Sequence, residues 1–173
     1  MPTVKDIDEA TFVEIYGGVY EHSPWVARQA YREGLQSLEA GWLARAFARQ
    51  VNAASHERKL QLIKAHPDLA GRAAVSGELT AASTAEQAGA GIDQCSEEEF
   101  ARFAEFNARY RARFGFPFIM AVKGSNRHEI LAAFAARVDN DYDEEFATAL
   151  GEIHKIAQFR LEAIAGNERL TRE

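Results

Sequence analysis

The clearest structural signal in the sequence is SEEEFARFAEFNARYRARFG, residues 96–115. Ser96 and Glu99 have the spacing of a capping box, in which each side chain bonds the backbone N–H of the other residue at the start of a helix. Gly115 is the residue type that commonly follows a helix, because it adopts left-handed backbone angles without strain. Between these two signals, aromatic residues occupy one stripe: Phe100, Phe103, Phe106, Tyr110 and Phe114. The segment therefore predicts one long amphipathic helix.

The same three- and four-residue spacing of apolar side chains continues through most of the chain and predicts further helices. Ser23 is expected to cap one of them, and Gly166 is expected to follow the last. Residues 68–94 predict short helices and loops, with one helix beginning near Thr80 or Ser83. The other expected helices cover residues 12–18, 25–31, 38–51, 55–66, 126–138 and 141–165, and only residues 116–122 look extended.

These elements predict the fold class. Alanine is the commonest residue and valine is scarce, which argues against a large sheet. No internal repeat, linker or low-complexity stretch divides the chain. We therefore predict an all-α protein, with a single compact domain over residues 1–173 and about eight to ten helices.

The composition argues against several classes of protein. With 173 residues, 47% hydrophobic and 27% charged, the chain is typical of one soluble domain. Its net charge of -6 disfavours contact with the phosphates of nucleic acid. No run of about 18 apolar residues occurs, and the N-terminus lacks the pattern of a signal peptide. The single cysteine, Cys95, cannot form an internal disulfide. We expect a cytoplasmic protein that binds neither nucleic acid nor membranes.

Common metal and nucleophile motifs are absent from the sequence. None of the five histidines has a glutamate three positions before it, and no two histidines are three or four residues apart. The spacing of helical metal sites is therefore missing. There is no Gly-x-Ser-x-Gly elbow, and Gly89-Ala90-Gly91 lacks the strand and third glycine of a dinucleotide-binding loop. We predict no metal site.

Two polar features stand at positions suited to chemistry. His66 precedes Pro67, which disfavours helical angles at His66 and holds it at a corner where its imidazole can serve as a general acid or base. The alternative is that His66 and Asp68 cap neighbouring helices. Arg160 lies on the inward stripe of the last predicted helix, where a guanidinium needs an anion. That anion could be a ligand or, more commonly, an internal carboxylate.

Two further features offer hydrogen-bonding groups. Ser83, Glu86 and Gln87 stand at positions i, i+3 and i+4, which places a hydroxyl, a carboxylate and an amide on one helix face. A capping box between Ser83 and Glu86 explains the same spacing about equally well. The backbone groups of residues 118–122 have no obvious strand partner and need partners if buried. A planar, amide-rich small molecule or a neighbouring loop could supply them.

Four segments of the chain occur in the order found in a known family: EHSPW at 21–25, HPDLAG at 66–71, STAEQAGAGID at 83–93 and FNxxYxxxFGFPFI at 106–119. Together they resemble 2-oxo-4-hydroxy-4-carboxy-5-ureidoimidazoline (OHCU) decarboxylase of urate breakdown. The resemblance implies an all-α, cofactor-free enzyme, usually a homodimer, that converts OHCU to (S)-allantoin with loss of carbon dioxide. The sequence ends Leu170-Thr171-Arg172-Glu173 without a peroxisomal signal, which favours a free-standing cytosolic enzyme.

The resemblance also implies site residues. The catalytic residues fall on His66 and Glu86. The substrate-binding residues fall on Pro67, Ser83, Thr84, Ala85, Glu86, Gln87, the backbone of Phe118, Ile119, Met120, Ala121 and Val122, and Arg160. A non-catalytic helical module that binds a partner helix is the alternative of another class. A ureide hydrolase is a second enzyme alternative, but it needs a metal or nucleophile that the spacing does not provide.

Overall fold

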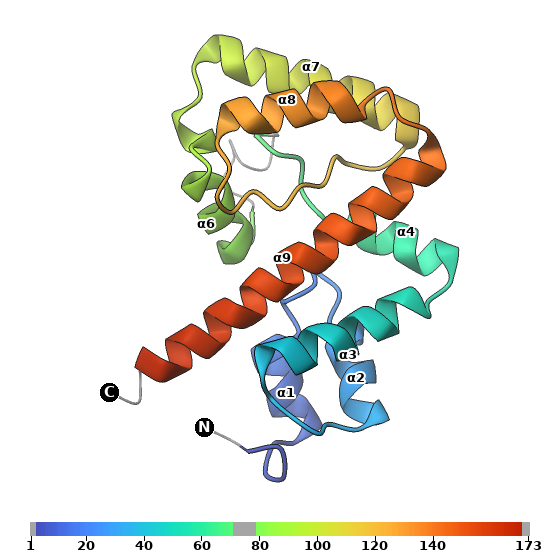
Figure 1. Cartoon of the computed structure of the whole chain (residues 1–173), viewed down its shortest axis with the longest axis vertical. Coiled ribbons are helices and arrows are strands. Elements are labelled where there is room, and N and C mark those ends of the chain that lie inside the picture. The colour runs from blue at the N-terminus through green and yellow to red at the C-terminus, as the bar shows by residue number, and fades with distance from the viewer. Residues whose placement is uncertain (1–2, 71–78, 171–173) are drawn as a thin grey trace. The chain divides into compact units, whose positions relative to one another are not determined.

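The computed structural model describes residues 3–70 and 79–170, and within these ranges every regular element is a helix (Figure 1). The all-α prediction is confirmed. The chain divides into two compact units, one formed by residues 1–65 and 153–173 and the other by residues 66–152. Residues 71–78, part of the predicted loop-rich stretch, and the last three residues of the chain lie outside the described ranges.

The first unit begins with α1 (Glu9–Tyr16), α2 (Trp25–Glu33), α3 (Ala40–Asn52) and α4 (His56–Lys64). The helix α1 packs against α2, and α2 packs against α3. Ser55 caps α4 as predicted, because its hydroxyl accepts a hydrogen bond from the Arg58 backbone N–H at 3.2 Å. Phe12 and Phe47, both fully buried, meet edge to face in the core of this unit.

The second unit contains α6 (Ala81–Gly89), the 3-10 helix η1 (Ile92–Gln94), α7 (Glu97–Phe114) and α8 (Arg127–Arg137). It also contains the beginning of α9 (Tyr142–Leu170), whose residues from Ile153 onward belong to the first unit. The helices α7 and α8 lie side by side (Figure 1). The aromatic stripe of α7 faces the core as predicted, with Phe103 and Tyr110 fully buried.

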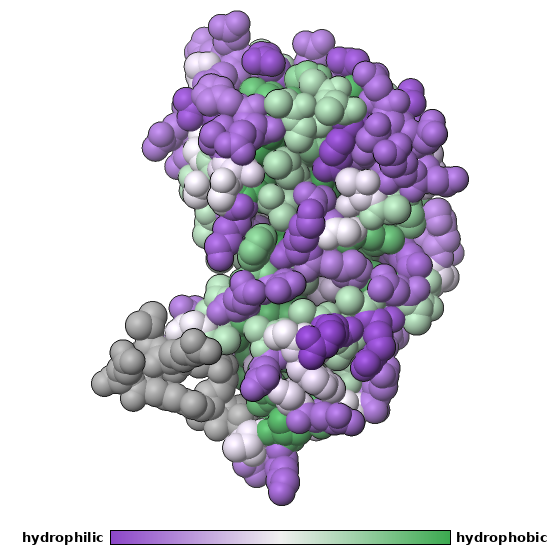
Figure 2. All heavy atoms as spheres, in the orientation of Figure 1, coloured by the Kyte–Doolittle hydropathy of each residue, from purple (hydrophilic) through white to green (hydrophobic). Residues whose placement is uncertain are grey.

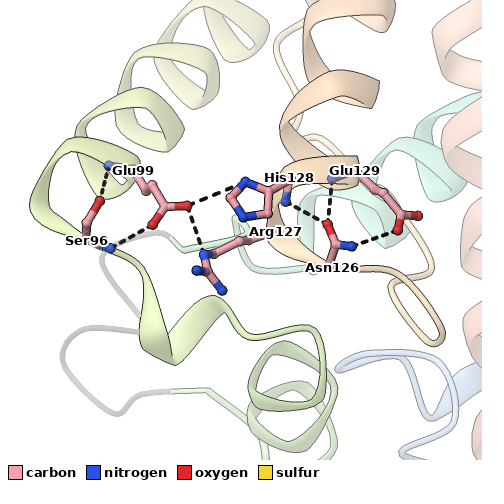
Figure 3. Close-up of polar contacts among 6 residues, drawn as sticks. All are labelled: Ser96, Glu99, Asn126, Arg127, His128 and Glu129. Atoms are coloured by element: carbon pink, nitrogen blue, oxygen red, sulfur yellow. Dashed lines mark hydrogen bonds and ion pairs between the residues drawn. The ribbon is translucent and has the colours of Figure 1, made fainter.

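The N-termini of α7 and α8 are joined by polar contacts (Figure 3). Ser96 and Glu99 form the predicted capping box, with hydrogen bonds of 3.1 and 3.0 Å. The other carboxylate oxygen of Glu99 accepts from Arg127 Nε at 2.8 Å. The backbone hydrogen bond from Ser96, assisted by Arg127, keeps the pKa of Glu99 below its ordinary value. Asn126 caps α8 by accepting from two backbone N–H groups. One ionised carboxylate therefore starts α7 and ties it to α8.

Two sequence predictions about helix ends are wrong. The Ser23 hydroxyl donates to the Glu21 carbonyl at 2.9 Å instead of capping α2, whose N-cap is Pro24. A serine hydroxyl can bond a nearby turn carbonyl as well as a helix N–H, and at Ser23 the bond to the turn carbonyl forms instead of the helix cap. The last helix passes through Gly166 to Leu170. A single glycine costs a helix only about 1 kcal/mol relative to alanine and does not end it unless the next turn is broken.

The surface is mainly polar. Hydrophilic side chains cover most of the face shown in Figure 2. Among the described residues, Tyr142 is the one large hydrophobic side chain classed as exposed, at 38%. Within the same part of the chain, no helix is both long and apolar enough to cross a membrane.

A half-buried histidine in the first unit lies against a tyrosine. His154 Nδ1 is 2.7 Å from the Tyr20 hydroxyl, and His154 Nε2 is 3.3 Å from Asn52 Oδ1. Because an amide oxygen only accepts, Nε2 carries the proton and Nδ1 accepts from the tyrosine. Burial raises the pKa of Tyr20, so its hydroxyl stays protonated. Burial, and then the charge of Lys59, lower the pKa of His154 below its ordinary value of 6.5. The folded protein therefore keeps this imidazole neutral.

Acid should weaken the fold through His154. Below pH 6.5 the unfolded chain binds this proton more readily than the folded protein, so the free energy of unfolding decreases as the pH falls toward the lowered pKa. We expect His154→Asn to show a smaller decrease between about pH 7.5 and 5.5. Urea titrations at both pH values measure it. His128→Asn, which changes a 70% exposed ring, is the control. Equal pH dependence in His154→Asn and the wild type would contradict the prediction.

Candidate active site

The corner at His66 begins the second unit. The helix α4 ends at Lys64, and His66 follows in a bend before Pro67, as the sequence predicts. The His66 side chain is buried, with 6% of the residue exposed. Ala70, in the turn that follows, has a φ of 52°, which is left-handed and therefore strained for a residue with a side chain. Such strain persists only where surrounding contacts hold it.

The helix α6 presents the predicted polar residues on one face. Thr80 is its N-cap and accepts from the Ser83 backbone N–H at 3.2 Å, so Ser83 lies inside the helix and the capping-box interpretation of Ser83 and Glu86 is wrong. Ser83 and Gln87 are buried and Glu86 is half-buried, whereas Thr84 and Ala85 are exposed. The face therefore directs a hydroxyl, a carboxylate and an amide inward, at the spacing that the sequence predicted.

Gln87 joins α6 to the corner. Its Oε1 accepts from the Ala70 backbone N–H at 3.1 Å, and its Nε2 donates to the Asp68 carbonyl at 3.4 Å. Arg111 of α7 pairs with the Asp68 carboxylate at 3.0 Å. The Asp68 carboxylate is thus bonded to α7. These contacts hold the corner that carries His66 against the polar face of α6.

The extended segment after α7 is buried at most of its positions. Phe118, Ile119 and Val122 are buried, and Met120 and Ala121 are half-buried. The Ile119 carbonyl accepts from Arg137 Nη1 at 2.7 Å. Part of the segment's backbone is therefore bonded to a side chain of α8. This segment and the corner at His66 belong to the same unit.

Arg160 belongs to the first unit and is buried, with 8% of the residue exposed. Its Nη1 lies 2.8 Å from Glu21 Oε2 and donates to the Gly18 and Val19 carbonyls at 3.3 and 3.5 Å. Glu21 is itself 2% exposed. The internal carboxylate that the sequence analysis considered for Arg160 is therefore Glu21.

Two residues that shape these contacts were not predicted from the sequence, Glu21 and Asn107. Glu21 lies in the EHSPW segment, but its pairing with Arg160 joins positions far apart in the chain. Asn107 donates from Nδ2 to the Leu69 carbonyl at 3.0 Å and so supports the corner. Asn107 Oδ1 is buried and is without a hydrogen-bond partner in the part of the chain that is described. Inward-facing polar residues next to an aromatic stripe are the signal that could have identified Asn107.

Potential metal ligands do not gather in the described ranges. Across residues 3–70 and 79–170, no group of three or more histidine, cysteine, aspartate or glutamate side chains has the arrangement of a metal site. The polar side-chain groups of the corner and of α6 are instead an imidazole, a carboxylate, a hydroxyl and an amide. Such a set suits proton transfer and the binding of a polar small molecule.

Sequence comparisons find related proteins over nearly the whole chain. The family model described as OHCU decarboxylase matches residues 5–162. The chain is 47% identical over 158 residues to the 2-oxo-4-hydroxy-4-carboxy-5-ureidoimidazoline decarboxylase of Haloferax volcanii, and the match covers 91% of each protein. It is 38% identical over 162 residues to the uric acid degradation bifunctional protein PucL of Bacillus subtilis, covering 93% of this chain and 32% of that protein.

Solved structures share the fold. A crystal structure of (S)-allantoin synthase matches with a TM-score of 0.72 and 33% identity, covering 94% of this chain and 54% of the solved chain. The present chain therefore spans about half the length of that protein. A crystal structure of OHCU decarboxylase in the presence of (S)-allantoin matches with a TM-score of 0.66 and 23% identity, covering 81% of this chain and 89% of that one. At this identity the second match supports the helical fold.

Proposed function

This chain belongs to the OHCU decarboxylase family, and from that premise we propose that it removes carbon dioxide from OHCU to form (S)-allantoin, with His66 as general acid and base. The observation that carries the activity is the family match over residues 5–162, which spans the corner at His66, α6, the extended segment and Arg160. The 47% identity to a named OHCU decarboxylase over 91% of both proteins supports the same activity.

The chemistry of the substrate explains which groups the protein needs. The carbon that carries the carboxylate and a hydroxyl stands next to a C=N bond. When the bond to the carboxylate breaks, its electron pair moves toward that C=N bond, and carbon dioxide leaves. The substrate thus contains its own electron acceptor. The protein must place the carboxylate, stabilise the delocalised charge and deliver a proton to one face of the ring.

The proposed roles combine the resemblance to the family with the burial of the side chains. His66, buried at the corner, would take the proton of the 4-hydroxyl and give the proton that creates the stereocentre of allantoin. Glu86 would orient and polarise the imidazole or bind the ureido N–H groups. Ser83 and Gln87 would hydrogen-bond the ring and ureido amides, beside Pro67, Thr84 and Ala85. The corner is held against α6 through Gln87, which supports a role for both elements in one site.

Binding of the planar substrate would use two further elements. The backbone of Phe118, Ile119, Met120, Ala121 and Val122 would bind its edge. Arg160 would contact an anionic or carbonyl oxygen as an orienting group. A guanidinium that gripped the carboxylate too tightly would stabilise the ground state as much as the transition state and would not raise the rate. The ion pair with Glu21 supports this weaker role, because it offsets the charge of Arg160.

Assembly and compartment are part of the same proposal. The resemblance to the family supports a homodimer, and the single cysteine supports a cytoplasmic protein. The proposed partner of the site is the small-molecule substrate alone, without a cofactor or metal.

An assay with OHCU freshly made from urate tests the activity. We expect the absorbance of OHCU to disappear faster than by spontaneous decay, and the circular dichroism of the product to show (S)-allantoin. Heat-denatured protein is the control for non-enzymatic decay. A racemic product formed at the background rate contradicts the decarboxylase and favours the helical interaction module.

A further inference from the structure

A buried ionic cluster lies against the extended segment, on the side of α8 and α9. Arg137 is the last residue of α8 and Glu145 lies in the first turn of α9. Arg137 donates from Nε and Nη2 to the Glu145 carboxylate, at 3.1 and 2.9 Å to Oε2. Tyr110 of α7 donates to the same oxygen, and Asn140 donates to Oε1 at 3.0 Å. Glu145 is completely buried. Three helices therefore converge on one carboxylate.

The charges of this cluster are well matched. Burial alone would raise the pKa of Glu145, but the hydrogen bonds from Arg137, Tyr110 and Asn140 and the charge of Arg137 lower it below the ordinary value. The carboxylate thus stays ionised at neutral pH and orients Arg137. Burial, and then the hydrogen bond to Glu145, raise the pKa of Tyr110, which remains a donor. Arg137 is consequently held in one position.

The third side of the guanidinium faces the extended segment. Arg137 Nη1 donates to the Ile119 carbonyl at 2.7 Å, and the guanidinium carbon lies 4.3 Å from the centroid of the Phe118 ring. The other face of Phe118 stacks on Phe134 of α8, with centroids 3.7 Å apart. Only an arginine offers a planar fork that can bind a carboxylate with one edge and a carbonyl with another nitrogen. The cluster therefore fixes both the backbone and the ring at the start of the segment.

We propose that Arg137 is a positioning residue for substrate binding: by holding the Ile119 carbonyl it fixes the direction of the backbone N–H and C=O groups of residues 118–122. This inference rests on the proposed role of that segment in reading the substrate edge. Arg137 acts through the segment and is not itself a substrate contact. A purely structural Arg137 would lower stability without changing affinity.

The first test is Arg137→Lys. Lysine keeps a positive charge beside Glu145, so the protein should fold, but its single nitrogen cannot replace the two that bind the carboxylate and the third that holds the carbonyl. We expect KM for OHCU and Kd for (S)-allantoin, measured by calorimetry, to rise about tenfold together, with a smaller change in kcat; tenfold equals about 1.4 kcal/mol. Arg113→Lys is the matched control, because Arg113 also donates to backbone carbonyls, those of Asp139 and Asn140. It should leave both constants unchanged.

A double variant covers the case in which Arg137→Lys fails to fold. Arg137→Met with Glu145→Gln removes both charges and keeps an acceptor for Tyr110, and uncharged replacements of buried ion pairs are often well tolerated. It should show the same rise in KM and Kd. Amide hydrogen exchange of residues 119–122 should be faster in both variants than in Arg113→Lys.

The outcomes separate this inference from the proposed function. Folded variants with unchanged KM and Kd overturn the positioning role, even if thermal stability falls. Faster exchange in residues 119–122 with unchanged Kd also overturns the positioning role. That result would show that the segment does not bind substrate, even if the protein turns over OHCU. Failure of the wild type to turn over OHCU contradicts the proposed function instead. The allantoin titration needs no turnover and still tests Arg137 in that case.

Discussion

Replacing His66 with asparagine lowers kcat for OHCU by about 10²- to 10⁴-fold, the range typical of a lost general acid or base. The reason is that no other imidazole is predicted for the site, and asparagine cannot take up or release a proton near neutral pH. The amide is smaller than the ring but keeps a polar atom near the position of Nδ1, so the buried corner should remain folded. His66→Ala should lose the same activity but leave a small cavity.

The measurement is the steady-state rate of loss of OHCU absorbance at saturating substrate, together with far-UV circular dichroism and a thermal unfolding curve for each variant. His128→Asn is the control, because that histidine lies in the same unit with 70% of its side chain exposed. It should retain wild-type kcat. Near-normal decarboxylation by His66→Asn, with His66→Ala also active, would remove His66 from the mechanism.

Replacing Arg160 with alanine lowers the free energy of unfolding by about 3–5 kcal/mol, because Glu21 is left as a buried carboxylate without this cation. For a chain of this length, that loss corresponds to a decrease of about 6–20 °C in Tm. The control is Arg28→Ala, which breaks a more exposed pair with Glu9 at 3.5 Å. A surface pair of that kind is worth at most about 1 kcal/mol.

A double-mutant cycle separates the two roles of Arg160. Glu21→Ala combined with Arg160→Ala removes both buried charges and should be less destabilised than the sum of the single variants. If Arg160 also contacts the substrate, KM for OHCU stays raised in the double variant. Recovery of wild-type KM in that variant would show that Arg160 supports the fold without binding substrate. Unchanged stability in Arg160→Ala would contradict the ion-pair argument.

The helices were predictable because their signals are local. The capping box at Ser96, the cap at Ser55 and the glycine after α7 act within a few residues, and each lies where the sequence indicated. The wrong predictions at Ser23 and Gly166 also concern local signals, but weaker ones. A serine hydroxyl can bond either a turn carbonyl or a helix N–H, and a helix can either end at a glycine or pass through it. Small differences in free energy decide between these outcomes, and the residue type alone does not reveal them.

The candidate site was predictable in part. Spacing alone placed Ser83, Glu86 and Gln87 on one helix face, and Pro67 placed His66 at a corner. The hydrogen bonds and ion pairs that hold the candidate site residues in place join positions far apart in the sequence. Gln87 bonds Ala70 across 17 residues, and Arg160 bonds the Gly18 carbonyl across 142. No local pattern identifies Glu21 as the partner of Arg160 or Arg137 as the group that holds Ile119.

The sequence by itself therefore determined the helical class, most helix ends and the identity of the polar residues that could carry chemistry, because capping, periodicity and proline act over one or two turns. The tertiary structure alone decided which buried charge meets which partner and which carbonyl is held in place. The physical reason is that a buried arginine or glutamate must find its counterpart wherever the packed chain brings one. That choice depends on long-range packing and leaves no trace in residue spacing.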